Sequence, residues 1–225
     1  MIRQSSVIRI LQITDPHLRA EPEGVLLGMN TRQSLDAVLQ VVQQRHPQPD
    51  MVLATGDIAQ DGSVAAYEAF QQRMQVFSCP VYWFAGNHDH RESMQQVIGG
   101  TPSALRAHRE GAWLLIFLDS SSPGQVHGDL SAGELAHLDQ QLAAHPDAHV
   151  LVCLHHHPVD VGCRWLAPIG LRNPDVFWSV LDQYTHVRGV LWGHIHQAFD
   201  AQRGGVRLLA SPSTCVQFAP GSDEF

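Results

Sequence analysis

Charged residues are scarce in this chain, and basic residues are the scarcest of them. Only 16% of its 225 residues are Asp, Glu, Lys or Arg, and 14 basic residues stand against 22 acidic ones, for a formal net charge of −8. A broad nucleic-acid-binding surface needs an excess of positive charge, so a nucleic-acid partner is disfavoured. The 44% hydrophobic content still allows a sizeable core, and this length favours a single domain over residues 1–225.

Long apolar runs are missing as well. No stretch of about 18 apolar residues occurs, which excludes a transmembrane helix and leaves no support for a membrane role. The N-terminus "MIRQSSVIRILQITD" lacks the apolar stretch and cleavage site of a signal peptide. The chain has only four cysteines and no C-x-x-C pair, which fits a reducing, cytoplasmic environment.

Histidine is the residue type in excess. The chain has 15 histidines, more than its 14 Lys and Arg residues together. A high histidine content often accompanies metal sites, but composition alone does not establish one, so the positions of these residues along the chain have to decide.

Short apolar runs alternate with helical patterns along the chain. The runs at residues 7–13, 51–54, 81–85, 113–118, 150–154, 187–192 and 206–209 predict strands. Helices are predicted for residues 31–44 behind a Thr31 cap, for 63–77, for 131–144, where Ser131 and Glu134 form a capping-box pattern, and for 173–184. This alternation is typical of an α/β protein with parallel or mixed sheets.

Polar clusters follow five of the predicted strands. In open α/β sheets, the loops at the carboxyl ends of strands are where ligand sites form. The clustered residues are Asp15 and His17 in "ITDPHL", Asp57 in "ATGDIAQD", Asn87, His88 and Asp89 in "GNHD", His155, His156 and His157 in "HHHP", and His194 and His196 in "WGHIH". Five unrelated caps and turns would be a poor explanation for this set, so we expect the side chains to converge on one site.

The chemistry of these residues indicates a two-metal centre. Asp, Asn and His without thiolate suit Fe, Mn, Zn or Co, and a carboxylate has two oxygens with which to bridge two cations. We expect the D-x-H and H-x-H pairs to face one pocket because alternate side chains of an extended backbone point the same way. The glycines before Asp57, Asn87 and His194 would let the chain turn sharply.

The ordered motifs resemble the calcineurin-like metallophosphoesterase superfamily. The stretches "RILQITDPHL", "LATGDIAQD", "GNHD", "LHHHPVDVGCRWL", "LRNPD", "GHIHQ" and "SPSTCVQF" are more narrowly similar to the bacterial class III 3′,5′-cyclic-AMP phosphodiesterases. This resemblance implies a four-layer αββα sandwich with two mixed sheets. Members usually continue past the last of these stretches, which raises the question of a missing C-terminal segment.

The resemblance also implies roles for individual residues. One metal would be bound by Asp15, His17, Asp57 and His196, and the other by Asp57, Asn87, His156 and His194, so that Asp57 bridges. The family spacing H-x-P selects His156, and we expect His155 and His157 to point away on an extended chain. His88 would act on the phosphate, with Asp89 orienting its ring. Substrate would contact His17, Asp57, Asn87, His88 and His196.

The implied reaction is hydrolysis of 3′,5′-cyclic AMP to 5′-AMP by a hydroxide that bridges the metals, with His88 as the acid group. The metals would be Fe or Mn, with Zn, Co or Mg as further candidates. Two alternatives remain open: a broader phosphodiesterase or nucleotidase acting on 2′,3′-cyclic nucleotides or other small diesters, and a non-catalytic metal-bound scaffold. Trp165 and Phe218 are candidates for stacking on a purine, and His127 and Asn173 for lining the nucleotide pocket. The sequence leaves monomer and homodimer equally open.

Overall fold

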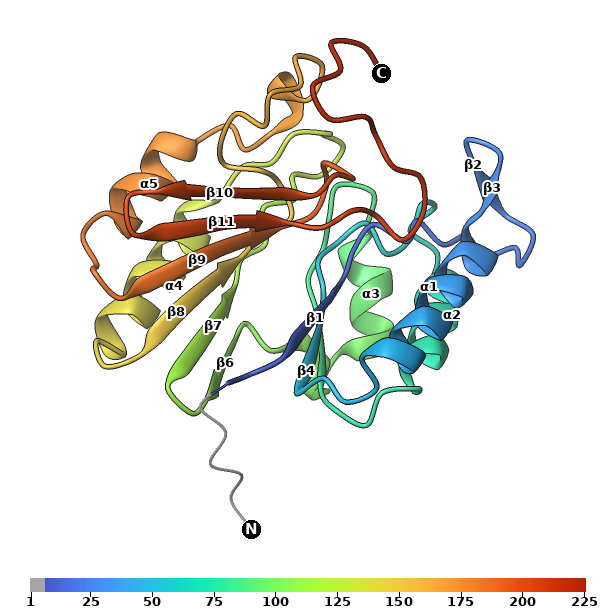
Figure 1. Cartoon of the computed structure of the whole chain (residues 1–225), viewed down its shortest axis with the longest axis horizontal. Coiled ribbons are helices and arrows are strands. Elements are labelled where there is room, and N and C mark those ends of the chain that lie inside the picture. The colour runs from blue at the N-terminus through green and yellow to red at the C-terminus, as the bar shows by residue number, and fades with distance from the viewer. Residues whose placement is uncertain (1–6) are drawn as a thin grey trace.

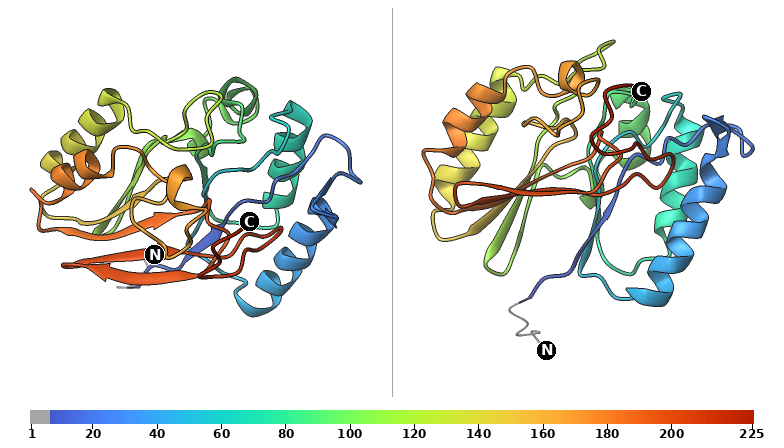
Figure 2. Two further views of the ribbon diagram at one scale, coloured as in Figure 1. Left: turned by 90° about the horizontal axis from the view of Figure 1, so that it is seen from above. Right: turned by 45° about the horizontal axis from the view of Figure 1, so that its top comes forward.

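A computed structural model describes residues 7–225 of the chain. Two β-sheets lie face to face, and helices cover the outer face of each (Figures 1 and 2). The expected four-layer αββα sandwich is confirmed. Among the described residues no helix is both long and apolar enough to cross a bilayer.

The smaller sheet comes from the first half of the chain and is parallel rather than mixed, so only the larger of the two sheets is mixed as expected. Its strand order is β1 (Ile10–Ile13), β4 (Met51–Ala54) and β5 (Val81–Trp83). Helices α1 (Thr31–Arg45), α2 (Val64–Met74) and α3 (Arg91–Ile98) cover its outer face (Figure 2). Leu35, Tyr67 and Phe70 from these helices are fully buried against Val52 and Ala54 of the central strand.

The larger sheet has six strands and is mixed. Its order is β10 (Phe199–Arg203), β11 (Val206–Ala210), β9 (Val187–Trp192), β8 (His149–Cys153), β7 (Trp113–Phe117) and β6 (Ala107–Glu110). The two outermost pairs are antiparallel and the three inner pairs are parallel. Helices α4 (Ala132–Ala144) and α5 (Pro174–Leu181) pack on its outer face.

Successive side chains of a strand point to opposite faces of the sheet, so apolar side chains pack alternately against the outer helices and against the other sheet. In β7, Leu114 and Ile116 face the outer helices, whereas Leu115 and Phe117 face the other sheet. The core between the sheets is completed by side chains from both, among them Met51, Leu53, Tyr82 and Phe84 of the small sheet. The two sheets therefore share one continuous apolar interface.

Helix starts agree with the sequence in one case and correct it in another. The Ser131 side chain caps α4 by accepting a hydrogen bond from the amide of Glu134, as predicted. The Glu134 carboxylate does not complete a capping box, because it binds Arg106 and the amide of Asp119 instead. At α1 the predicted Thr31 cap is wrong: Asn30 is the cap and accepts from the amide of Gln33.

Several elements had no counterpart in the sequence prediction. They are α3, the edge strands β6 and β10, the short 3-10 helices at Pro102–Ala104 and Ala167–Ile169, and a hairpin of β2 (Val25–Leu26) and β3 (Met29–Asn30). The first strand, expected from residue 7, begins at Ile10, and the helices expected over 63–77 and 173–184 end earlier, at Met74 and Leu181.

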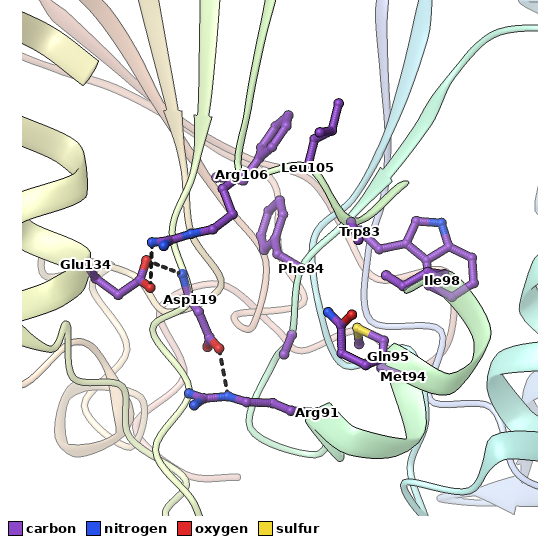
Figure 3. A pocket seen from close by; sticks show the side chains of 13 residues that line it. Trp83, Phe84, Arg91, Met94, Gln95, Ile98, Leu105, Arg106, Asp119 and Glu134 are labelled. Atoms are coloured by element: carbon purple, nitrogen blue, oxygen red, sulfur yellow. Dashed lines mark hydrogen bonds and ion pairs between the residues drawn. The ribbon is translucent and has the colours of Figure 1, made fainter. Parts of the chain in front are cut away.

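Linked ion pairs join the first half of the polypeptide to the second beside a cavity of about 270 Å³ (Figure 3). Arg91 at the start of α3 pairs with Asp119 after β7, at 2.7 Å, and Glu134 of α4 binds both Arg106 and the amide of Asp119. Every charged side chain of this cavity therefore has a partner of opposite sign within the protein. We regard the arrangement as structural, because it fixes the end of the loop that contains residues 86–90.

Candidate metal centre

The polar clusters meet because the strands that precede them are parallel within each sheet. The loops after β1 and β4 lie side by side, with the amide of His17 donating to the Asp57 carbonyl (3.0 Å) and that of Asp15 to the Gly56 carbonyl (3.2 Å). The loops after β8 and β9 are joined by the amide of Gly193, which donates to the His155 carbonyl (3.2 Å). Loops from both sheets thus build one site, as the sequence predicted.

The backbone at the site is strained. Five non-glycine residues adopt the left-handed conformation here, with φ between 47° and 66°: Asp15, His17, Asp57, His194 and His196. Each such residue costs on the order of 1 kcal/mol. The expected reason for the pairs facing one pocket, an extended backbone, is therefore wrong. The side chains do share the pocket, but left-handed turns at the strand ends aim them there.

Asp15, His17 and His196 form the first corner. Nε2 of His196 lies 3.3 Å from Asp15 Oδ1 and 3.1 Å from Nε2 of His17. The other ring nitrogens are occupied: Nδ1 of His196 donates to the Val216 carbonyl (2.7 Å) and Nδ1 of His17 to Gln60 Oε1 (2.7 Å). In both rings Nε2 therefore carries the lone pair and lies on the side of the Asp15 carboxylate, where a cation could bind it. This is the arrangement of metal-binding histidines.

Asp57 lies between this corner and the next. Its Oδ2 atom is 3.7 Å from His17 Nε2 and 3.3 Å from His155 Nε2, while Oδ1 accepts from the amide of His88 (2.9 Å). A Cβ at Gly86 would come within 2.2 Å of Oδ1, so only glycine allows this close approach. The carboxylate thus faces histidines from both sheets.

The second corner contains a histidine that was not expected to be a ligand. His155 was expected to point away, but its Nε2 lies 3.2 Å from His194 Nδ1, and its Nδ1 donates to the Thr55 carbonyl (2.8 Å). His156, the expected ligand, also lies within the cluster, but Nδ1 is bonded to Ser120 Oγ and Nε2 to the Val126 carbonyl. His155 is therefore better placed as a ligand than His156.

Two buried polar atoms of the site have no partner within the protein. They are Oδ1 of Asn87 and Nε2 of His194, and both side chains were predicted as ligands. A buried polar atom without a partner is costly, and a cation would satisfy an amide oxygen and an imidazole lone pair alike. Groups of Asp and His ligand atoms also lie within 4.8 Å of one another at each corner. The residues present therefore fit bound metal ions.

His88 lies at the exposed rim of the cluster, with its ring 5.0 Å from that of His17. Its Nδ1 is 3.2 Å from Nε2 of Gln60, whose Oε1 accepts from His17. Gln60 can only donate through Nε2, so Nδ1 of His88 accepts and Nε2 carries the proton. Gln60 was not singled out in the sequence, although it stands in the quoted motif "LATGDIAQD".

Asp89 does not orient the His88 ring, so its expected role is wrong. Its carboxylate accepts hydrogen bonds from the amides of Gly86 and Ala59 (2.8 and 2.9 Å), and from the hydroxyl of Tyr67 (3.0 Å). Asp89 therefore links its own loop, through Gly86, to the loop after β4, through Ala59. Burial, reinforced by the charge of Asp57, raises the pKa of Asp89 to about 7.

The electrostatics of the cluster suit deprotonated carboxylates. Burial disfavours the Asp57 anion, but the nearby His155 outweighs it and holds the pKa of Asp57 well below its usual range. The pKa of Asp15 is lowered in the same way by His196. Burial lowers the pKa of His17 to about 4 against the opposing charge of Asp57, so His17 is neutral at pH 7 and its Nε2 can bind a cation.

A cavity of about 280 Å³ opens over the cluster. All five expected substrate-contacting residues line it: His17, Asp57, Asn87, His88 and His196. Trp165 and Phe218, the candidates for stacking on a purine, also line it. Asn173 does not: its side chain holds the amide and carbonyl of Leu130 (3.1 and 2.8 Å). His127 is not among the lining residues, although its neighbour Val126 is.

Known proteins are similar to this chain over most of its length. Residues 8–198 match a family model described as calcineurin-like phosphoesterase. The 3′,5′-cyclic adenosine monophosphate phosphodiesterase CpdA of Pseudomonas aeruginosa is 47% identical over 97% of this chain and 80% of its own length. The protein of the same name from Escherichia coli K12 is 44% identical, with the same coverage. The resemblance found in the motifs is confirmed.

Among solved structures, a dimetal phosphatase from Danio rerio is similar over 93% of this chain and 88% of its own, with a TM-score of 0.73. Its sequence is 16% identical, so this likeness shows the fold alone.

Proposed function

Because the chain belongs to the calcineurin-like phosphoesterase family, we propose that it hydrolyses 3′,5′-cyclic AMP to 5′-AMP at the cluster beneath this cavity. The observation that supports the substrate most directly is the identity of 44–47%, over 97% of the chain, to enzymes named for this activity. The cluster adds the chemistry, since it combines two carboxylates, an amide and several imidazoles with unbonded ligand atoms.

We propose that two metal ions bind here. Asp15, His17, Asp57 and His196 would bind the first, and Asp57, Asn87, His194 and a histidine of the "HHHP" stretch the second. We assign that last place to His155 rather than His156, because Nε2 of His155 faces Asp57 and His194 while its Nδ1 donates to a carbonyl. Iron and manganese are the metals that we expect first, since no thiolate takes part.

Bound metal ions supply Lewis acidity, which lowers the pKa of water and makes a nucleophile available at neutral pH. The protein's own side chains supply the proton and position the substrate. Nδ1 of His88 accepts from Gln60, so Nε2–H is available to donate to a phosphate oxygen or to the departing 3′ oxygen. Asn87 and His196 border the same cavity, so the phosphate end of the substrate would lie over the cluster.

The substrate is therefore a small molecule, and the single-domain organisation over residues 1–225 stays a prediction, as does a cytoplasmic location. All four cysteines are free, which supports a reducing compartment.

The test compares three substrates on protein loaded with manganese: 3′,5′-cyclic AMP, 2′,3′-cyclic AMP and bis(p-nitrophenyl) phosphate. We expect hydrolysis of 3′,5′-cyclic AMP with the highest kcat/KM, and a loss of roughly a hundredfold or more in kcat for His88→Ala with the metal content unchanged. His90→Asn is the matched control, because His90 is exposed and caps α3 through a bond that Asn can replace.

Hydrolysis of the synthetic diester without hydrolysis of 3′,5′-cyclic AMP would keep the metal centre and reject the proposed substrate. A preference for 2′,3′-cyclic AMP would favour the broader phosphodiesterase activity. Loss of metal in His88→Ala would make His88 a ligand and contradict its assigned role.

A further inference from the structure

The hairpin of β2 and β3 has an unusual residue at its tip. Val25 pairs with Asn30 and Leu26 with Met29, which leaves a two-residue turn of Leu27 and Gly28. Both have positive φ, 48° and 83°, as a type I′ turn requires. Asn-Gly is the usual sequence for such a turn because Asn tolerates the left-handed conformation. A bulky Leu in its place is strained.

Burial does not explain why a leucine stands there. The Leu27 side chain is 65% exposed, so the hairpin gains little core packing from it. Leu27 is nevertheless not an isolated surface residue. Together with Leu26 it lines the cavity over the metal cluster. Leu27 is thus a largely exposed apolar side chain that borders the cavity and stands on a strained backbone turn.

The hairpin is held in place from below. The Asn30 side chain caps α1 and also donates to the Pro22 carbonyl (3.3 Å), and the amide of Thr31 donates to the Gly24 carbonyl (3.3 Å). The Arg32 guanidinium donates to the carbonyls of Arg19 and Ala20 at 2.8 and 2.7 Å. These bonds tie the segment before the hairpin to the first turn of α1, beside which the hairpin stands (Figure 1).

Other apolar side chains complete the lining of the cavity. Trp165 and Phe218 meet edge to face with their ring centroids 4.9 Å apart, and Phe218 stacks on the His196 ring at 4.6 Å. The polar residues of the cavity belong to the loops of the cluster or to Gln60 beside them, whereas the other lining residues are apolar. Charged phosphate therefore fits the cluster, and an uncharged, flat group fits the space next to Leu27 and Trp165.

We propose that Leu27 is a substrate-binding residue that contacts the base of the cyclic nucleotide. The inference rests on the proposed function and adds to it the group that recognises the nucleoside. An aliphatic side chain on one face of a base contributes affinity without reading its hydrogen-bonding edge. The strain of the turn is retained because Leu at this position supplies that contact, which Asn or Gly would not.

Leu27→Asn is the informative change, because it relieves the turn and removes the apolar contact together. We expect its thermal unfolding midpoint to equal or exceed that of the wild type. KM for 3′,5′-cyclic AMP should rise roughly fivefold to tenfold, with kcat within about twofold. Leu27→Met should keep KM within about twofold because it remains apolar. Val25→Thr is the matched control: Val25 is exposed on the same hairpin but does not line the cavity.

A substrate without a base, the 3′,5′-cyclic phosphate of methyl riboside, separates base contact from other effects. L27N should leave its KM unchanged. An equal rise in KM for both substrates, or an unchanged KM for 3′,5′-cyclic AMP, would overturn the inference, and so would a lower unfolding midpoint without a change in KM. If the wild type does not hydrolyse 3′,5′-cyclic AMP, the proposed function fails and this inference fails with it.

Discussion

Asp57 is the residue on which both corners of the site depend. Its carboxylate faces His17 of the small sheet and His155 of the large sheet, and it is almost fully buried. Asp57→Asn keeps the shape and removes the charge, so we expect loss of both metal ions and a fall of about a thousandfold or more in kcat/KM. Metal content by elemental analysis and the hydrolysis rate measure the two effects.

Asp36→Asn is the control for that experiment. Asp36 pairs with Arg73 on the surface and is half exposed, so its loss should leave metal content and rate within about twofold. If D57N still bound one metal ion per protein with the affinity of the wild type, the bridging role of Asp57 would be contradicted.

Gln60 sets the position of protons on two rings at once. Gln60→Leu removes the bonds to His17 and His88 and keeps much of the volume. We expect kcat to fall roughly tenfold with a smaller effect on bis(p-nitrophenyl) phosphate, whose leaving group needs no proton. Ring ¹⁵N chemical shifts of the zinc-loaded protein should show a single Nε2–H tautomer of His88 in the wild type and a mixture in Q60L. An unchanged tautomer would contradict this role.

Residue identities at the site were more predictable than residue contacts. Asp15, His17, Asp57, Asn87, His194 and His196 lie together as the motifs indicated, and the atoms left without partners on Asn87 and His194 fit the ligand prediction. The choice between His155 and His156 depends on how the chain leaves β8, which alternation along an extended strand does not describe. The Gln60–His88 contact spans 28 residues, and no local pattern encodes it.

Helix α4 depends on its first turn for part of its stability. Ser131 Oγ accepts from the amide of Glu134, and Leu138 and Leu142 of the helix are fully buried against the large sheet. Ser131→Ala should lower the free energy of unfolding by about 1 kcal/mol and leave kcat/KM unchanged, because the cap lies outside the metal cluster. Urea denaturation measures the first and the cyclic-AMP assay the second.

Ser179→Ala serves as the comparison, since this exposed serine lies inside α5 and its hydroxyl donates to the Val176 carbonyl of the preceding turn. A loss in S179A as large as in S131A would argue against a capping effect.

At the level of elements, the prediction succeeded for strands that are buried on both faces and for helices of several turns. Strands β4 and β9 were predicted with the bounds that the structure has, because β4 is a continuous apolar run and β9 is interrupted only by Arg188 and Gly189. The missed strands β6 and β10 lie at sheet edges, where "AHRE" and "FDAQR" have no such pattern. The missed helix α3 has only eight residues and begins behind His90, an uncommon cap.

The whole molecule should be most stable near pH 6.5 when metal is removed. Burial lowers the pKa of His17 and His157 to about 4, and those of His156 and His194 well below 6.5. Between pH 6.5 and 4 the unfolded chain therefore binds more protons, and stability falls as the pH falls. For His17 alone the loss is about 3 kcal/mol.

Two groups act in the opposite direction. The pKa of Asp89 is raised to about 7, so its contribution is complete below the usual carboxyl pKa and is lost as the pH rises through 7. His155 is buried beside Asp57, whose charge more than offsets burial and raises the pKa of His155 to about 10, so stability falls again above pH 6.5. Unfolding midpoints of chelator-treated protein from pH 4 to 10 measure this profile. A midpoint that rises steadily toward pH 10 would contradict it.

During translation the two sheets leave the ribosome one after the other. The first 98 residues contain the three strands of the small sheet and its helices, and with them Asp15, His17, Asp57 and Asn87. The face formed by Met51, Leu53, Tyr82 and Phe84 is covered only when β7, β8 and β9 have been made. His155, His194 and His196 arrive with or after those strands. A nascent chain therefore has an incomplete ligand set and an uncovered apolar face at the same time, and both are completed by the same docking event.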